Sequence, residues 1–333
     1  MSAKAASLLL GLCLYLGVLP AGALEPLAPG KGRFVFPEGG DRTGQSVTPS
    51  VAPTVTHRVT VWYYKPAALT RTSRIVFVMH GTRRNGRSYR DHWVAYAEQY
   101  GFLLAVPEFS RRHFPRDAYQ LGNVRDANPA HWSFAVLEHL FDALRARESL
   151  EAQRYSLYGH SAGAQFVHRH MLFMPAPRVD IAIAANAGAY TFPVYAVASG
   201  PAFPWALDRT LVTEAGLRAA FGRCLVVMLG EKDIDSRHSS LPRSRQAMAQ
   251  GRDRLNRGQN FYRVAGEQAA LLKTPFNWQQ VIVPGVGHHD TGMARVAVKY
   301  LMEAPWQAVE NRCADARVFD NECPPAGTRS AAP

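Results

Sequence analysis

The sequence predicts an α/β fold with a mostly parallel central sheet and helices on both of its faces. Two observations support this expectation. Apolar runs of strand length recur along the chain, and segments with the apolar spacing of a helix lie between them. Several of these runs are continuously apolar, which is typical of parallel strands that are covered on both sides. Hydrophobic residues make up 47% of the 333 residues, which is enough for one large domain with a substantial core or for two modest domains.

The expected strands and helices alternate along the chain. HRVTVWYY at 57–64 has the composition of a strand, and RIVFVMH at 74–80 is a continuous apolar run. DHWVAYAEQY at 91–100 has helical spacing, and FLLAVP at 102–107 predicts another strand. A strongly amphipathic helix is expected at 131–147. The remaining expected elements are strands at 154–159, 181–188, 224–230 and 278–285 and helices at 161–173 and 293–304.

The two ends of the chain differ in composition from this alternating region. Lys4 precedes an apolar stretch that is too short to span a bilayer comfortably, and Ala21-Gly22-Ala23 matches a small-x-small cleavage rule. We interpret this stretch as a secretory signal that is cleaved after Ala23, with a retained membrane anchor as the alternative. The mature protein is then expected in the periplasm or outside the cell, without stable membrane insertion. The expected organisation is a signal peptide at 1–23, an extended lead-in at 24–54, an α/β domain at 55–305 and a tail at 306–333.

Residues 191–222 interrupt the alternation with proline, glycine and aromatic residues. An insertion at the carboxyl edge of a parallel sheet lies where ligands bind in such folds. The segment is either a lid over a site or an elaborated crossover, and the sequence leaves both interpretations open.

The chain is strongly basic, with a formal net charge of +12. Its arginines are scattered in ones and twos, and no nucleic-acid-binding motif accompanies them. We therefore expect a generally basic surface and no nucleic-acid partner. The sequence does not indicate the oligomeric state.

The chain has four cysteines, of which Cys13 would leave with the signal peptide. Cys313 and Cys323 flank a polar segment of the tail and could form a disulfide in an oxidising compartment. Cys224 lies in an apolar run, and we expect it to be a small buried hydrophobic residue. No Cys-x-x-Cys spacing is present, so a structural zinc site is not expected.

The stretch GHSAG at 159–163 places Ser161 among small residues, between an expected strand and an expected helix. This G-x-S-x-G pattern is typical of a strained turn that lifts a serine hydroxyl above the end of a sheet. The start of the following helix would also favour negative charge that develops there. Ser161 is therefore the candidate nucleophile.

A serine hydroxyl needs a base, and that base needs a carboxylate to orient it. Asp233 follows an expected strand in the turn GEKDID, and His288 follows another in the turn GVGHHD. Both lie at carboxyl ends of strands and follow the serine in the order that this arrangement requires. Ser161, Asp233 and His288 are thus the predicted catalytic triad. Asp235 remains an alternative acid, and a degenerate scaffold with coincidental Asp and His residues remains an alternative for the trio.

We expect no catalytic role for the other histidines near these motifs. His289 and Asp290 adjoin His288, but no third ligand pattern stands nearby, so no metal is expected. His160 is expected to support the turn rather than to react. His168 and His170 are two residues apart on a helix, and we expect packing or surface positions for them.

Acyl transfer also needs hydrogen-bond donors for the oxyanion. The backbone amide of Ala162, directly after the serine, would be one donor. The loop HGTRRNG, which follows an expected strand, would supply the other through the amide of Thr82, unless it is an ordinary Asn-Gly turn. Asn186 and Tyr190 follow the next strand and are expected either to line a substrate pocket or to form a simple turn.

These motifs resemble the α/β-hydrolase superfamily over residues 55–305. Within the superfamily, HGTRRNG followed by GHSAGAQF looks most like secreted esterases of the polyhydroxybutyrate depolymerase and feruloyl esterase type. The resemblance implies an eight-stranded sheet, the triad and oxyanion donors named above, and no cofactor. The segment 191–222 departs from the pattern and leaves the substrate preference open. The motifs that carry the resemblance are HG at 80–81, GHSAG at 159–163, GEKD at 230–233 and GVGH at 285–288.

The expected function is that of a secreted serine hydrolase, which cleaves small-molecule or polymeric carboxylic esters through an acyl-enzyme intermediate. One alternative is a peptidase or amidase with the same triad. The other is a non-catalytic binding protein that keeps the fold and uses its basic surface.

Overall fold

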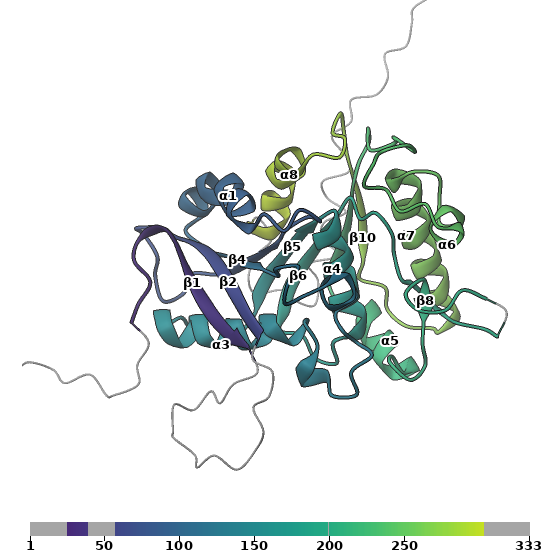
Figure 1. Cartoon of the computed structure of the whole chain (residues 1–333), viewed down its shortest axis with the longest axis horizontal. Coiled ribbons are helices and arrows are strands. Elements are labelled where there is room, and N and C mark those ends of the chain that lie inside the picture. The colour runs from purple at the N-terminus through teal and green to yellow at the C-terminus, as the bar shows by residue number, and fades with distance from the viewer. Residues whose placement is uncertain (1–24, 39–56, 199, 303–333) are drawn as a thin grey trace, which may run out of the picture.

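The structure, a computed structural model, describes residues 25–38, 57–198 and 200–302. Eight strands form one sheet in the order β1-β2-β4-β3-β5-β6-β9-β10 (Figure 1). β1 and β4 both pair antiparallel with β2, and every other neighbouring pair is parallel. The predicted α/β fold with a mostly parallel sheet is confirmed. The strands are β1 (Gly30–Glu38), β2 (His57–Lys65), β3 (Ile75–Met79), β4 (Leu103–Glu108), β5 (Tyr155–His160), β6 (Val179–Ala185), β9 (Leu225–Gly230) and β10 (Gln279–Val283).

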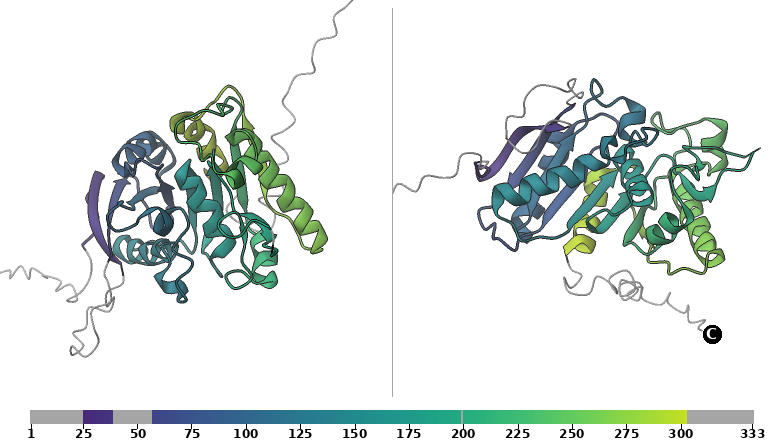
Figure 2. Two further views of the ribbon diagram at one scale, coloured as in Figure 1. Left: turned by 45° about the vertical axis from the view of Figure 1, so that its right-hand side comes forward. Right: turned by 90° about the horizontal axis from the view of Figure 1, so that it is seen from below.

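Helices cover both faces of this sheet (Figures 1 and 2). One face carries α1 (Gly86–Tyr100) and α8 (Asp290–Met302), and the other carries α3 (Ala135–Glu148), α4 (Ala162–Phe173), α5 (Glu214–Phe221) and α7 (Arg254–Leu271). Three shorter elements lie in the connections: α2 (Arg116–Tyr119), the 3₁₀ turn η1 (Pro129–His131) and α6 (Arg245–Ala249).

The central strand β3 shows why the apolar runs are continuous. Its residues alternate between the two core clusters: Phe77 packs on the side of α3 and α4, and Val78 packs on the side of α1 and α8. All five of its side chains are fully buried. Because each fully buried apolar side chain contributes about 1.5–3 kcal/mol, both faces of the strand favour the folded state.

The strand β1 lies inside the region that was expected to be an extended lead-in. It pairs with β2 over its full length, from Gly30 opposite Lys65 to Glu38 opposite His57. As an edge strand it buries only one face, so Phe36 is 9% exposed while Val35 is 54% exposed. The sheet therefore includes residues of the expected lead-in, before residue 55.

The helix α7 was not among the expected elements. Its buried apolar stripe is narrow and consists mainly of Phe261, Ala265 and Ala269, whereas the buried residues of its first turn include Arg254 and Arg257. Hydrophobic periodicity detects helices by their apolar stripe, and this stripe is weak. The start of α7 nevertheless becomes central to the site described below.

The segment 191–222 forms two short strands, β7 (Phe192–Tyr195) and β8 (Ala206–Leu207), followed by α5. β7 packs against α7, with the rings of Phe192 and Phe261 6.0 Å apart. Thr191 joins the segment to α4 by accepting a hydrogen bond from Arg169 Nε at 2.8 Å. The segment is thus packed onto the domain in this structure, and its role as a lid stays a prediction.

Cys224, directly before β9, is disulfide-bonded. The other cysteines of the chain, Cys13, Cys313 and Cys323, lie outside the described residues. The expectation that Cys224 is merely a small buried hydrophobic residue is therefore wrong. A Cys313–Cys323 pair and the signal peptide both fall outside the described residues. Within the described ranges, no helix is long and apolar enough to cross a membrane.

Candidate active site

Three of the predicted site residues meet at the carboxyl edge of the sheet. Ser161 follows β5, Asp233 lies in the turn after β9, and His288 lies in the turn after β10. The Ser161 hydroxyl is 3.0 Å from His288 Nε2, and His288 Nδ1 is 2.8 Å from Asp233 Oδ2. Since a carboxylate only accepts, Nδ1 carries the hydrogen and Nε2 is left to accept the hydroxyl proton. The arrangement can transfer a proton away from the serine.

The backbone at Ser161 is held in a strained turn. Its φ of 58° and ψ of −112° lie in a region that residues other than glycine rarely adopt. Small residues make the turn fit: a Cβ on Gly159 would lie 2.4 Å from Gly163 O, and a Cβ on Gly163 would lie 2.1 Å from Met79 O. The glycines of GHSAG thus let α4 begin directly against the ends of β5 and β3.

The structure distinguishes the two candidate acids by position. Asp233 is 3% exposed and contacts His288 through Oδ2. Asp235 is exposed, and its Oδ1 accepts a hydrogen bond from the amide of Arg237 at 2.9 Å. Of the two, Asp233 is the carboxylate that faces the imidazole.

The residues next to His288 have other partners. His289 Nδ1 lies 2.9 Å from Thr291 Oγ1, and Asp290 contacts His92 and Tyr158. The hydrogen bond to Asp290 raises the pKa of His92 above its ordinary value. In the part of the chain that the structure describes, no three His, Cys, Asp or Glu side chains are grouped so that they could hold a metal ion.

The loop after β3 lies beside the serine. A Cβ built on Gly81 would be 3.9 Å from Ser161 Cβ, and the amide of Arg84 donates to Gly81 O at 3.1 Å, which closes a tight turn around Thr82. Thr82 is exposed. Neither its amide nor that of Ala162 donates a hydrogen bond to another described residue. Two backbone donors therefore remain available beside the serine hydroxyl.

His80, directly after β3, holds this loop in place. Its Nε2 accepts a hydrogen bond from the Phe109 amide at 3.0 Å, and its Nδ1 lies 3.0 Å from Gly81 O. Both contacts require a neutral ring with the hydrogen on Nδ1. Complete burial lowers the pKa of His80 to about 3, so the ring stays neutral at ordinary pH.

Asn186 and Tyr190 are both buried. The Asn186 side chain accepts from the Gly230 amide at 2.7 Å and donates to Gly287 O at 3.1 Å, so it ties the turn of Asp233 to the turn of His288. Tyr190 is fully buried and stacks on Phe261 with ring centroids 4.4 Å apart. Both residues support the fold in this structure, and their contact with a substrate stays a prediction.

Two residues near the triad were not predicted to belong to the site. Arg254 Nη1 lies 3.4 Å from Asp233 Oδ1, and the ring of His238 lies 5.3 Å from the ring of His288.

Asp253 caps the start of α7 by accepting a hydrogen bond from the Asn256 amide. Because an acidic N-cap can be recognised in a sequence, this residue is a signal that could have located the start of α7. His160, expected to support the turn, lies 3.2 Å from the Tyr89 hydroxyl, and its ring is 4.7 Å from that of His288.

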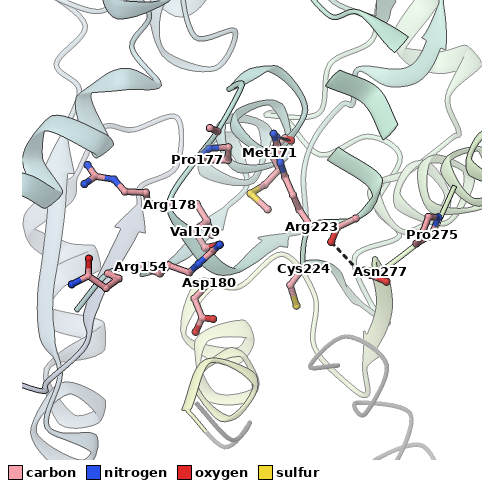
Figure 3. Close-up of a pocket in the computed structure, with 13 residues that line it drawn as sticks. Arg154, Met171, Pro177, Arg178, Val179, Asp180, Arg223, Cys224, Pro275 and Asn277 are labelled. Carbon is pink, nitrogen blue, oxygen red and sulfur yellow. Dashed lines mark hydrogen bonds between the residues drawn. The ribbon is translucent and has the colours of Figure 1, made fainter. Parts of the chain in front are cut away.

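A pocket of about 800 Å³ lies at the opposite edge of the sheet (Figure 3). It is lined by residues at the amino ends of β5, β6 and β9, including Arg154, Asp180 and Cys224. None of the predicted site residues borders it. The pocket is therefore separate from the Ser161 site.

Comparison with known proteins gives the following similarities. No protein-family model and no curated protein sequence matches the chain. Among solved structures, poly(aspartic acid) hydrolase-1 from Sphingomonas sp. KT-1 is 37% identical with a TM-score of 0.73, covering 82% of this chain and 98% of that one. A poly(3-hydroxybutyrate) depolymerase from Bordetella parapertussis is 30% identical with a TM-score of 0.72, covering 86% and 94%. An S-formylglutathione hydrolase from Agrobacterium tumefaciens, at 17% identity, shares the fold with a TM-score of 0.50 and covers 83% and 95%.

Proposed function

Because the chain belongs to the α/β-hydrolase superfamily, we propose that it is a serine hydrolase that cleaves carboxylic esters through an acyl-enzyme on Ser161. The observation that carries the proposal is the unbroken series of hydrogen bonds from the Ser161 hydroxyl through His288 to Asp233. Two relatives that are at least 30% identical are named as hydrolases of polymers, which supports a polymeric substrate.

In the proposed reaction, His288 Nε2 takes the hydroxyl proton as Ser161 Oγ attacks the ester carbonyl. Asp233 keeps the imidazole in the required tautomer and stabilises its protonated form. The amides of Thr82 and Ala162 donate hydrogen bonds to the tetrahedral oxyanion. Collapse then breaks the carbon–oxygen bond of the ester, and His288 returns the proton to the leaving alcohol. A water molecule, deprotonated by His288, releases the acid from Ser161 in the second half-reaction.

Labelling and turnover of a serine variant test this proposal. Ser161→Ala is expected to fold, to lose turnover of a p-nitrophenyl ester and to lose covalent labelling by a fluorophosphonate. Ser239→Ala, which removes an exposed serine near the site, serves as the control and should react like the wild type. Equal ester turnover by Ser161→Ala and the wild type would exclude the mechanism.

Cleavage of amide bonds in an anionic polymer is the second candidate. The first relative acts, by its name, on poly(aspartic acid), and the carboxyl edge of this chain carries the exposed arginines Arg83, Arg111 and Arg112. Arg111 Nη2 donates to Thr82 O at 2.9 Å, so a cation lies directly beside the proposed oxyanion loop. Exposed cations attract an anionic chain through a field that salt screens.

Matched substrates separate the two candidates. We would compare an aryl ester with the corresponding anilide and then follow the shortening of poly(aspartic acid). If the polymer is a substrate, Arg83→Ala should lower kcat/KM for it several-fold at low salt and leave the neutral ester unaffected. Arg71→Ala, which removes an exposed arginine near the amino end of β3, is the control. Cleavage of the ester alone would exclude the second candidate.

Export from the cytoplasm is also part of the proposal. The Cys224 disulfide supports it, because disulfides persist mainly in oxidising compartments. Sequencing of the secreted or periplasmic protein should find Leu24 as its first residue. Recovery of the full-length chain from the cytoplasm, with Cys224 reduced, would contradict it.

A further inference from the structure

The two oxygens of the Asp233 carboxylate have different partners. Oδ2 accepts from His288 Nδ1 at 2.8 Å, and Oδ1 faces Arg254 Nη1 at 3.4 Å. The side chains of Asp233 and Arg254 are 2% and 1% exposed, respectively. A buried carboxylate that is held by one bond alone can still turn about its side-chain torsion. The guanidinium supplies the second point of attachment.

Arg254 is well placed to hold this carboxylate, because α7 begins at this residue. Asp253 caps the helix, and the Leu255 amide donates to the main-chain oxygen of Asp233 at 3.3 Å. The start of α7 is therefore attached to the Asp233 turn through both backbone and side chain. The amino end of α7, which is the positive end of its dipole, therefore lies beside the Asp233 turn.

The second branch of the guanidinium reaches the loop that packs on the base. Arg254 Nη2 donates to Ser240 Oγ at 2.8 Å and lies 3.4 Å from His238 Nδ1. The His238 ring packs edge-on against His288. One guanidinium thus connects the acid of the triad to a side chain that contacts its base.

We propose that Arg254 is a positioning residue that holds Asp233 in its catalytic orientation, so that the carboxylate keeps its hydrogen bond to His288 Nδ1. This inference rests on the proposed function.

The test compares Arg254→Met with Arg257→Met in full-length mature protein. Arg257 lies one turn further along α7, is fully buried, and donates to the main-chain oxygens of Gly251, Gly188 and Pro242. Both variants remove a buried guanidinium from one helix, but only the first removes a partner of Asp233. Activity is expressed per active site, counted by fluorophosphonate titration, so that loss of folded protein does not enter the result.

For Arg254→Met we expect kcat to fall about 10- to 100-fold with little change in KM, because a misplaced catalytic group costs rate of this order. Arg257→Met should keep kcat within about twofold of the wild type. A kcat within twofold of the wild type for Arg254→Met would overturn the proposal.

A conservative variant decides the question if Arg254→Met does not fold. Arg254→Lys keeps the charge, but an ammonium cannot contact Asp233 Oδ1 and Ser240 Oγ together as the planar guanidinium does. We expect a several-fold lower kcat with little change in KM. A lysine variant with the wild-type kcat would overturn the positioning role. Absence of labelling in the wild type would instead refute the proposed function itself, before any variant is compared.

Discussion

The carboxyl edge and the amino edge of the same sheet satisfy their polar groups in opposite ways. At the carboxyl edge, Ser161 and Asn186 both adopt positive φ, and the amides of Thr82 and Ala162 donate to no other described residue. A buried arginine and a buried carboxylate lie directly behind them. The carboxyl edge therefore retains backbone strain and backbone amides that can still donate a hydrogen bond.

The arginines of the amino edge lie around the pocket drawn in Figure 3 and bond to neighbouring groups of the protein. Arg223 donates to the main-chain oxygens of Met171 and Pro175, which lie at the end of α4. Arg178 forms ion pairs with Glu138 and Asp142, and its pKa is raised by the hydrogen bond to Asp142. Cys224 adds a covalent link at the same edge.

The direction of the strands explains this difference. A helix that follows a parallel strand begins at the carboxyl edge and ends at the amino edge, as α4 does between β5 and β6. Its free amides therefore gather at one edge and its free carbonyls at the other. Anionic intermediates suit the first edge, and arginines that cap carbonyls suit the second. We therefore expect catalysis to depend on one edge and stability on the other.

The largest expected effect is on the acid at the carboxyl edge. Asp233→Asn should lower kcat by about 10⁴-fold, because an amide no longer holds the imidazole in the correct tautomer. Asp235→Asn, two residues away and exposed, should stay within twofold of the wild type. Steady-state kinetics per active site measure both. A strong loss in Asp235→Asn with little loss in Asp233→Asn would reverse the assignment of the acid.

Two helix glycines provide the next comparison. Gly163→Ala places a Cβ 2.1 Å from Met79 O, a backbone atom that cannot move aside, and should lower the free energy of unfolding by about 4 kcal/mol. Gly266→Ala, in α7, meets only Phe276 at 3.5 Å and should raise it by up to about 1 kcal/mol. Urea unfolding measures both. Equal stability of the two variants would refute the close packing of α4 against β3.

Loss of the disulfide should affect stability without affecting the chemistry. Cys224→Ser is expected to lower the free energy of unfolding by about 3 kcal/mol, while kcat at low temperature stays within twofold. Peptide mapping without reductant should identify the partner, and reduction should bring the wild type to the level of the variant. A Cys224→Ser enzyme that folds normally but has lost its activity would contradict the separation of the two edges.

The smallest expected effect of a single substitution, about 1.4 kcal/mol per pH unit, concerns the pH dependence of stability. Burial lowers the pKa of His80, His160 and His170 to about 3 in the folded protein, so all three are neutral there. The unfolded chain binds these protons near pH 6.5, so each histidine removes about 1.4 kcal/mol of stability per pH unit as the pH falls from 6.5 towards 3.

A single substitution tests this dependence. His170→Gln should reduce the slope of unfolding free energy against pH below pH 6.5 by about 1.4 kcal/mol per pH unit. His131→Gln, at an exposed position, should leave the slope unchanged. Unfolding free energies that are flat between pH 7 and 5 in the wild type would show that these histidines are not buried as described.

The sequence predicted much of the sheet and identified the three residues that lie together at its carboxyl edge. Strands such as β3 and β9 are apolar on both faces, so composition alone reveals them. Ser161, Asp233 and His288 could then be placed, because the carboxyl ends of parallel strands converge at one edge. Asn186 follows a strand in the same way, yet its side chain turns inward to Gly230 and Gly287. Position after a strand gives the edge but not the direction of a side chain.

The order of elements, the strained serine turn and the candidate triad were determined by local sequence, because each depends on residue type at a fixed spacing. The pairing of β1 with β2, the Cys224 disulfide and the contact of Arg254 with Asp233 were decided only by the tertiary structure. Each of these contacts depends on how whole helices and strands pack against one another, and no periodicity in the sequence indicates such a contact.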